Sequence, residues 1–142
     1  MRKVILKMQI SLDGIVSGEG EWMSFSDSIV SDAMDYYETL DTIIVGSKFY
    51  YFLSDYWQTA EKSSDSLTER IFANRINEID KIVLSRSPIN LTWRNSHELN
   101  FKDTRDLIKQ IQEIKSKPGK DISVESGLGT WKLFLQHNLF DE

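Results

Sequence analysis

Short β-branched runs that alternate with amphipathic helical segments constrain the fold of this chain more than any other feature. Residues 42–45, 81–84 and 121–124 read T-I-I-V, K-I-V-L and D-I-S-V, each followed within two residues by Gly or Ser. Such runs are typical of strands buried on both faces of a parallel sheet. Residues 4–10 form a further strand candidate, with apolar residues at alternate positions, and residues 91–93 form an additional one. The sequence therefore predicts an α/β fold with a mainly parallel sheet.

Apolar residues at helical spacing predict helices between these strands. The pattern covers residues 29–37, 48–57, 67–79, 107–114 and about 130–137. Ser66 and Glu69 have the spacing of a capping box, which marks the start of the third helix. Parallel strands need crossover connections, so we expect helices on both faces of the sheet. The chain has no repeat or linker, and residues 1–142 are predicted to form a single domain.

Composition and charge exclude several classes of protein. The net charge is −5 and no Lys/Arg cluster is dense, which argues against a nucleic-acid partner. The absence of Cys and the presence of only two His argue against a metal site or a thiolate nucleophile. Neither the first residues nor the apolar stretch 42–53, which Lys48 interrupts, reaches the length of a signal peptide or membrane span. We expect a cytoplasmic protein without a membrane partner.

Polar and glycine residues follow the first two strands, at the edge where open sheets bind ligands. Ser11 and Asp13 precede Gly14 after the first strand. This pattern indicates either a substrate-anchoring acid beneath a mobile loop or a simple Asp-Gly turn. The second strand leads into Gly46–Ser47–Lys48 and a helix start, which suits a phosphate group. In the alternative interpretation, Gly46 only gives clearance and Lys48 is solvated.

The third and fourth strands also end in residues that suit phosphate groups. Ser85 and Arg86 combine a hydroxyl with a guanidinium, which matches a ribose 2′-phosphate and therefore NADPH, although a lone arginine after a strand is more often a surface residue. Ser126, Gly127 and Leu128 precede the last helix, and a glycine there lets the backbone approach a pyrophosphate. The sequence thus predicts that separate turns converge on one dinucleotide.

The motifs S-L-D-G, V-G-S-K-F-Y and L-S-R-S, with the ending L-F-L-Q-H-N-L-F-D-E, resemble those of the dihydrofolate-reductase-like family. The nearest branch comprises bacterial proteins related to the reductase domain of bifunctional riboflavin-biosynthesis deaminase–reductases. The resemblance implies a three-layer α/β/α sandwich that binds NADPH. It also implies an oxidoreductase that transfers hydride to a pterin-, flavin-precursor- or pyrimidine-like heterocycle.

The resemblance also implies roles for individual residues. Ser11 and Asp13 are expected on the nicotinamide and substrate side, as the catalytic residues. The residues expected to contact the cofactor come from the three later turns: Gly46, Ser47, Lys48, Ser85, Arg86, Ser126, Gly127 and Leu128.

Two departures from the family pattern keep other interpretations open. Ser126 stands where the family usually has the first of two glycines, and serine resists unusual backbone geometry. The printed sequence ends at Glu142, before the C-terminal hairpin of the family, so we expect an unpaired sheet edge that favours a homodimer. A non-catalytic nucleotide-binding or assembly module is therefore an alternative function. A flavodoxin-like domain is a further alternative, disfavoured because no phosphate-binding loop follows the first strand.

Overall fold

The computed structural model of the protein describes residues 1–23 and 26–142, which form helices and strands in the alternating order that the sequence predicts. The elements within these residues are β1 (Val4–Ile5), α1 (Glu19–Trp22), α2 (Asp27–Glu38), β2 (Leu40–Gly46), α3 (Ser47–Ser63), α4 (Leu67–Glu78), β3 (Asp80–Ser85), β4 (Ser96–Asn100), α5 (Thr104–Ser116), β5 (Asp121–Val124) and α6 (Leu128–Gln136).

The strands of the described residues form one five-stranded sheet in the order β1-β5-β2-β3-β4. Each strand pairing is parallel. Ile44 of β2 lies at the centre, in register with Ile82 of β3 and Val124 of β5. Because all strands run the same way, their carboxyl ends meet at one edge of the sheet, which we call the carboxyl rim. The opposite edge is the amino rim.

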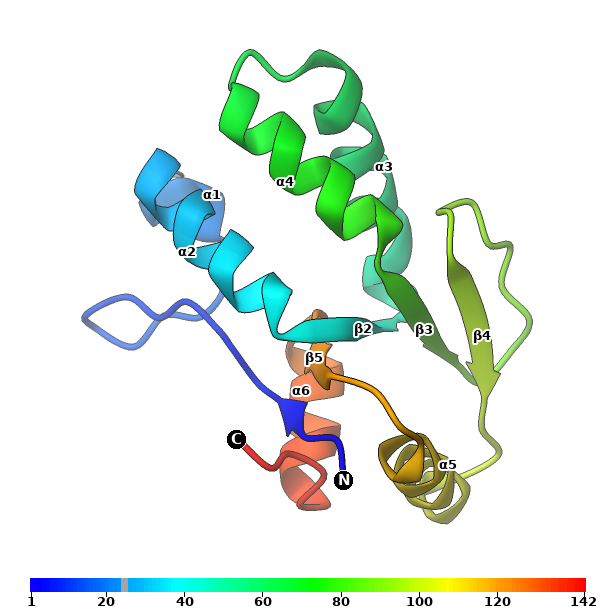
Figure 1. Ribbon diagram of the computed structural model, residues 1–142. Coiled ribbons are helices and arrows are strands. Elements are labelled where there is room, and N and C mark those ends of the chain that lie inside the picture. The colour runs from blue at the N-terminus through cyan, green and yellow to red at the C-terminus, as the bar shows by residue number, and fades with distance from the viewer. Residues whose placement is uncertain (24–25) are drawn as a thin grey trace.

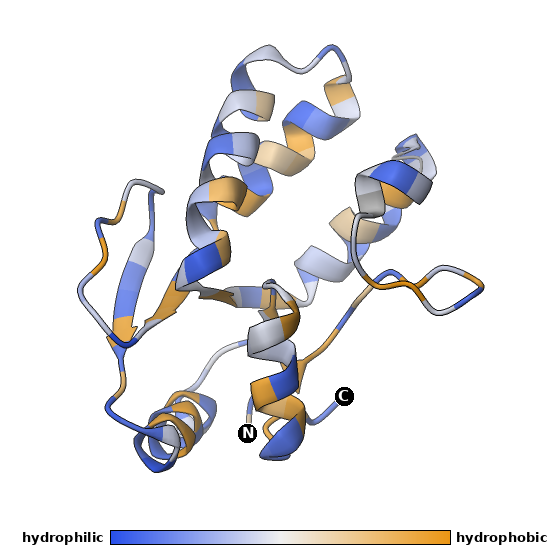
Figure 2. Ribbon diagram, turned by 180° about the vertical axis from the view of Figure 1, so that it is seen from behind, coloured by the Kyte–Doolittle hydropathy of each residue, from blue (hydrophilic) through white to orange (hydrophobic). Residues whose placement is uncertain are grey.

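Helices cover both faces of this sheet (Figure 1). Ile44 belongs to a core cluster that α5 and α6 complete, whereas its neighbours Ile43 and Val45 belong to a cluster completed by α2, α3 and α4. Alternate residues of β2 therefore point into different cores, as expected for a strand buried on both sides. Figure 2 shows α5 with its hydrophobic side turned inward. The predicted three-layer α/β/α sandwich is confirmed.

Three elements differ from the sequence prediction. Strand β1 ends at Ile5, and residues 7–9 border a cavity instead of continuing the sheet. The predicted strand at 91–93 is wrong: Trp93 is buried and donates its indole N–H to Asn77, and the edge strand is β4. That strand reads S-H-E-L-N and carries no β-branched residue, so its sequence gives no strand signal. The short helix α1 lies where only a loop was expected.

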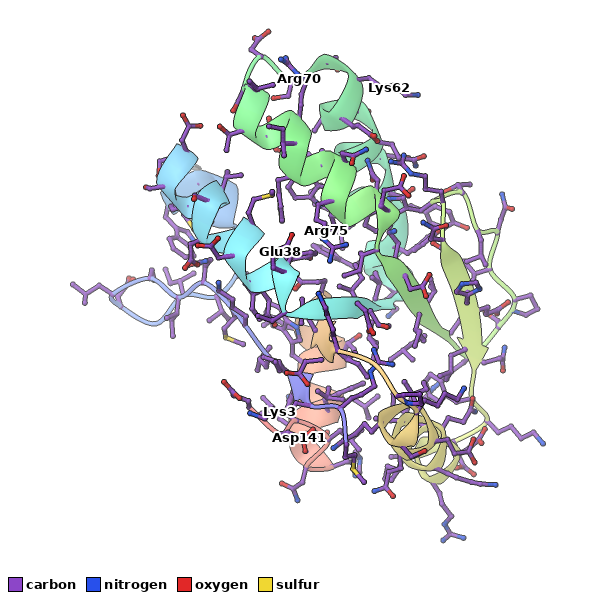
Figure 3. The ribbon with its side chains drawn as sticks, viewed as in Figure 1. Lys3, Glu38, Lys62, Arg70, Arg75 and Asp141 are labelled. Carbon is purple, nitrogen blue, oxygen red and sulfur yellow. The ribbon has the colours of Figure 1, made fainter. Side chains whose placement is uncertain are left out.

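The outer edge of β1 is occupied by the C-terminal residues of the same chain. Asp141 donates its backbone N–H to the Val4 carbonyl oxygen (2.8 Å), and Leu6 donates to the Glu142 carbonyl oxygen (2.9 Å). The Asp141 carboxylate also accepts from Lys115, and Figure 3 shows Asp141 and Lys3 at this edge. The expected unpaired edge is therefore not found at β1, and the homodimer stays a prediction.

No helix in the described ranges is both long enough and apolar enough to cross a lipid bilayer.

Candidate functional site

A cavity of about 470 Å³ opens at the carboxyl rim, between α2 on one side and α3 and α4 on the other. Its volume is in the range of small-molecule sites, which are mostly apolar with a few placed polar groups. Its walls are mainly aliphatic and aromatic: Met8, Met23, Ile29, Val30, Ala33, Tyr36, Tyr37, Phe49, Leu53, Trp57, Phe72, Ile76 and Trp131. The polar lining residues are Lys7, Gln9, Asp32, Ser66, Glu69, Glu125 and Ser126.

The helices on the two sides of the cavity are tied together near the amino end of β2. Arg75 of α4 donates to the carbonyl oxygen of Tyr37 (3.0 Å) at the end of α2 and to that of Leu40 (3.1 Å) at the start of β2. Arg75 and Glu38 also point toward one another, with 4.0 Å between Nε and Oε1 (Figure 3). The cavity therefore has a fixed base, because one guanidinium joins α4 to α2.

The turns after β2 and β5 meet at the carboxyl rim, beside the cavity. Gly46 donates its backbone N–H to the Ser126 hydroxyl at 3.0 Å. A Cβ atom at position 46 would lie 2.6 Å from that hydroxyl oxygen and 2.5 Å from the Thr130 hydroxyl oxygen. A side chain at position 46 would therefore push the two turns apart. The predicted convergence of these two turns is confirmed.

Ser126 does not strain this turn, contrary to the expectation from the missing glycine. Gly127 has φ −85°, and Ser126 is not among the residues with positive φ in the described part of the chain. The turn needs no left-handed backbone, so a serine fits at position 126. Its hydroxyl instead holds the neighbouring turn at Gly46.

The starts of α3 and α6 leave their backbone N–H groups open at this rim. Their N-cap residues, Gly46 and Gly127, make no side-chain cap, and neither helix has an acidic residue in its first turn. By contrast, α4 and α5 are capped by Ser66 and Asp103 and carry an acidic residue in the first turn. Uncapped helix starts with a positive dipole end suit an anion.

The other cofactor-contact candidates lie around this rim without lining the cavity. Ser47 is half-buried, whereas Lys48 and Leu128 are exposed in the first turns of α3 and α6. Ser85 is buried at the end of β3, and its hydroxyl pairs with the backbone of Ser87. Arg86 is exposed, with its guanidinium 5.4 Å from the Phe101 ring centroid. Of the predicted cofactor residues, the structure brings only Ser126 to the cavity wall.

The two predicted catalytic residues lie in the first loop, which extends away from the sandwich (Figure 1). The Ser11 hydroxyl donates to the Asp13 carboxylate at 2.6 Å and accepts from the backbone N–H of Ile15 at 2.8 Å. Gly14 closes the turn with φ +90°. Neither Ser11 nor Asp13 lines the cavity, so the structure does not bring them to the other candidate residues. Their catalytic role stays a prediction.

A chain of hydrogen bonds that the sequence analysis missed lies at the cavity wall. The Tyr36 hydroxyl donates to Ser123 at 2.9 Å, and the Ser123 hydroxyl donates to Glu125 at 2.6 Å. Burial raises the pKa of the Glu125 carboxyl, and it also raises the pKa of Tyr36 to about 12. The sequence signal that could have revealed these hydrogen bonds is the spacing of Ser123 and Glu125. Residues two apart at the end of a strand point to the same face, and both are polar next to a buried apolar run.

The cation at the cavity wall is already paired. Lys7 lies 2.7 Å from the Asp32 carboxylate and 4.6 Å from the Tyr36 ring centroid. Within residues 1–23 and 26–142 there is no group of three or more His, Cys, Asp or Glu side chains that could hold a metal ion. The site therefore offers apolar walls, a protonatable carboxyl group and two open helix starts.

Comparison with known proteins covers nearly the whole chain. Residues 2–142 match the model of the RibD C-terminal domain family. A relative from Bacillus subtilis (strain 168), described as the uncharacterized protein YyaP, is 26% identical over 145 residues. The match covers 99% of this chain and 71% of the relative.

Proposed function

The chain belongs to the RibD C-terminal domain family of reductase-like domains, and from this premise we propose that it is an NADPH-dependent reductase acting on a small heterocycle. The observation that carries the proposal is the contact between the starts of α3 and α6 beside an apolar cavity. Gly46 and Ser126 join these two starts with one hydrogen bond. A dinucleotide needs an anion-binding rim and an adjoining apolar slot, and the two occur side by side.

The residues at the rim fit the phosphates of NADPH. The uncapped N-termini of α3 and α6 offer backbone donors without a competing carboxylate in the first turn. Gly46 lets the turns approach closely, and Arg86 is an exposed guanidinium at the end of the neighbouring strand β3. We assign the pyrophosphate to the two helix starts and the 2′-phosphate to Arg86.

The chemistry divides between the cofactor and the protein. When bound, NADPH supplies the hydride. The apolar walls exclude water and hold the heterocycle flat, and reduction of its double bond also requires a proton. Glu125 is the candidate source of that proton, because burial raises its pKa and the Ser123 hydroxyl orients its carboxyl group. Asp13 remains a second candidate that would act from the first loop.

A non-catalytic nucleotide-binding module is the second candidate function. The position of Ser11 and Asp13 favours it, because Ser11 is half-buried, Asp13 is exposed, and both side chains hydrogen-bond within their own turn. This function predicts NADPH binding without oxidation. Titration and turnover measured on the same protein sample separate the two candidates.

The test compares NADPH binding by the wild-type protein, Gly46→Ala and Gly20→Ala. We expect Gly46→Ala to weaken binding by about tenfold or more, because its Cβ would meet the Ser126 and Thr130 hydroxyls. Gly20→Ala is the matched control, since a Cβ there meets no atom within 4 Å. NADPH oxidation with pterins and pyrimidines is then followed by absorbance. A flat titration of the wild-type protein would exclude both candidate functions.

A further inference from the structure

The charges around the cavity point to a specific class of substrate. Building on the proposed function, we infer that the substrate is a planar, largely apolar heterocycle that carries neither a phosphate nor a carboxylate group. This inference concerns only the cavity between α2 and the α3–α4 pair, and it is independent of how the rim holds the cofactor.

The lining of the cavity is acidic. Its carboxyl side chains are those of Asp32, Glu69 and Glu125, of which Glu125 is shifted by burial toward its neutral form, and its one cation is Lys7. The Lys7 ammonium is 2.7 Å from the Asp32 carboxylate, so its charge is already compensated. Among the described lining residues, no other cation remains to bind an anionic group. A phosphate inside the cavity would meet an excess of negative charge.

One end of the cavity lies at the start of α4, where the positive end of a helix dipole attracts anions unless an acidic residue compensates it. Here the Ser66 hydroxyl accepts the Glu69 backbone N–H at 3.2 Å, and Glu69 places a carboxylate in the first turn. That carboxylate is held by hydroxyl donors, Tyr56 at 2.5 Å and Ser64. Arg70 lies nearby, but it donates to the Ser64 carbonyl oxygen and does not line the cavity. The Glu69 carboxylate therefore already compensates the positive end of the α4 dipole.

The walls favour a flat, apolar ligand. Phe72 packs edge-on against both Trp57 (centroids 5.1 Å, 90°) and Tyr37 (5.0 Å, 85°). These three rings line the cavity, and Val30 and Ala33 line it from α2. A planar heterocycle that enters this cavity contacts aromatic and aliphatic side chains and buries its own apolar surface from water. A charged tail would lose its hydration without gaining a partner.

The experiment uses two pairs of probes that differ by one anionic group: riboflavin against riboflavin 5′-phosphate, and pterin against pterin-6-carboxylate. Binding to the full chain is followed by quenching of tryptophan fluorescence, with and without NADPH. We expect the uncharged member of each pair to bind about tenfold more tightly or better. Equal or tighter binding of the anionic member overturns the inference. So does the absence of binding by all four probes at about 1 mM.

Two variants test the cause of this preference. Asp32→Asn releases Lys7 from its ion pair, and we expect the preference for riboflavin over its phosphate to fall by about threefold or more. Glu69→Gln should act in the same direction. Asp35→Asn is the matched control, because Asp35 lies on the same helix, is exposed and does not line the cavity. An unchanged preference in both Asp32→Asn and Glu69→Gln contradicts the charge argument.

The outcomes distinguish this inference from the proposed function. If NADPH binds and the phosphorylated probe is preferred, only the substrate inference fails. If the uncharged probes bind preferentially but NADPH does not bind, only the proposed reductase function fails.

Discussion

Two ionisable groups at opposite ends of one sheet, the buried Lys81 and the half-buried Glu125, lie in very different surroundings. Lys81, at the start of β3, is fully buried, and its ammonium donates to the carbonyl oxygens of Asn77 (2.8 Å), Ile79 (2.6 Å) and Arg94 (3.1 Å). Glu125, after the end of β5, accepts from Ser123 and borders a cavity. Lys81 is enclosed by backbone oxygens, whereas Glu125 faces a space that a ligand can enter.

The surroundings of Lys81 extend this contrast. Arg94 forms a forked ion pair with Glu61, with both N–O distances 2.9 Å, and the hydrogen bonds from Arg94 and its neighbours hold the pKa of Glu61 at about 2. Trp93 and Asn77 complete this network near the amino rim. Such a network stabilises the fold, and none of its residues lines the cavity at the carboxyl rim. The contrast between Lys81 and Glu125 shows that a shifted pKa indicates a functional group only where a ligand can reach that group.

Removing the lysine should have the largest effect on stability. Lys81→Met leaves three carbonyl oxygens, two of them in buried hydrogen bonds, without their donor, so we expect the free energy of unfolding to fall by about 2–3 kcal/mol. Denaturant unfolding measures this loss. Lys62→Met is the control, because Lys62 is exposed at the end of α3 and labelled in Figure 3. A loss of similar size in both variants would mean that Lys81 is not a structural donor.

Replacing Glu125 should affect turnover and not stability. Glu125→Gln keeps an acceptor for the Ser123 hydroxyl but cannot supply a proton, so we expect NADPH oxidation to slow by about 100-fold. The free energy of unfolding should change by less than about 1 kcal/mol. The control is Glu113→Gln on the exposed side of α5. Unchanged turnover in Glu125→Gln would remove Glu125 from the mechanism.

The two groups should give opposite dependences of stability on pH. Burial lowers the pKa of Lys81 to about 7, so the unfolded chain binds more protons between about pH 7 and 10 and stability rises with pH there. Burial raises the pKa of Glu125, so its contribution is lost as pH rises through the pKa of the folded state. The free energy of unfolding is measured as a function of pH. The rise between about pH 7 and 10 should be absent in Lys81→Met, and the decrease assigned to Glu125 should be absent in Glu125→Gln. Retention of either slope would contradict the assignment of that group.

Replacing Asp13 in the first loop should have the smallest effect on turnover. Asp13 is exposed and its carboxylate bonds only within its own turn among the described contacts, so Asp13→Asn should change turnover by less than about twofold. Steady-state NADPH oxidation measures this. A loss of about 100-fold would instead support the catalytic role predicted from the sequence, and it would require the loop to reach the cavity.

Much of the fold follows from the sequence because its signals are local. The buried strands at 42–45, 81–84 and 121–124 and the Ser66 cap are confirmed within a few residues. Strand β4 was missed because it lies at the edge and its residues are mostly exposed, so tertiary pairing with β3 determines it. The pairing of residues 141–142 with β1 was missed because it joins the two ends of the chain.

The site was only partly predictable. The turns at Gly46 and Ser126 carry recognisable glycines after strands, and their convergence follows from parallel topology. The cavity itself depends on the separation of α2 from α4, which no local pattern encodes. For that reason Tyr36, Glu125 and Lys7 were not predicted as site residues, although each lines the cavity.

The central claim is that the carboxyl rim binds NADPH at the starts of α3 and α6. Hydrogen–deuterium exchange measured with and without saturating NADPH tests it most directly, because the open backbone N–H groups would become donors to the phosphates. We predict slower exchange in peptides covering residues 46–49 and 127–131, with residues 77–81 and 93–96 unchanged. Protection confined to other segments, or no protection at either helix start, would contradict the claim.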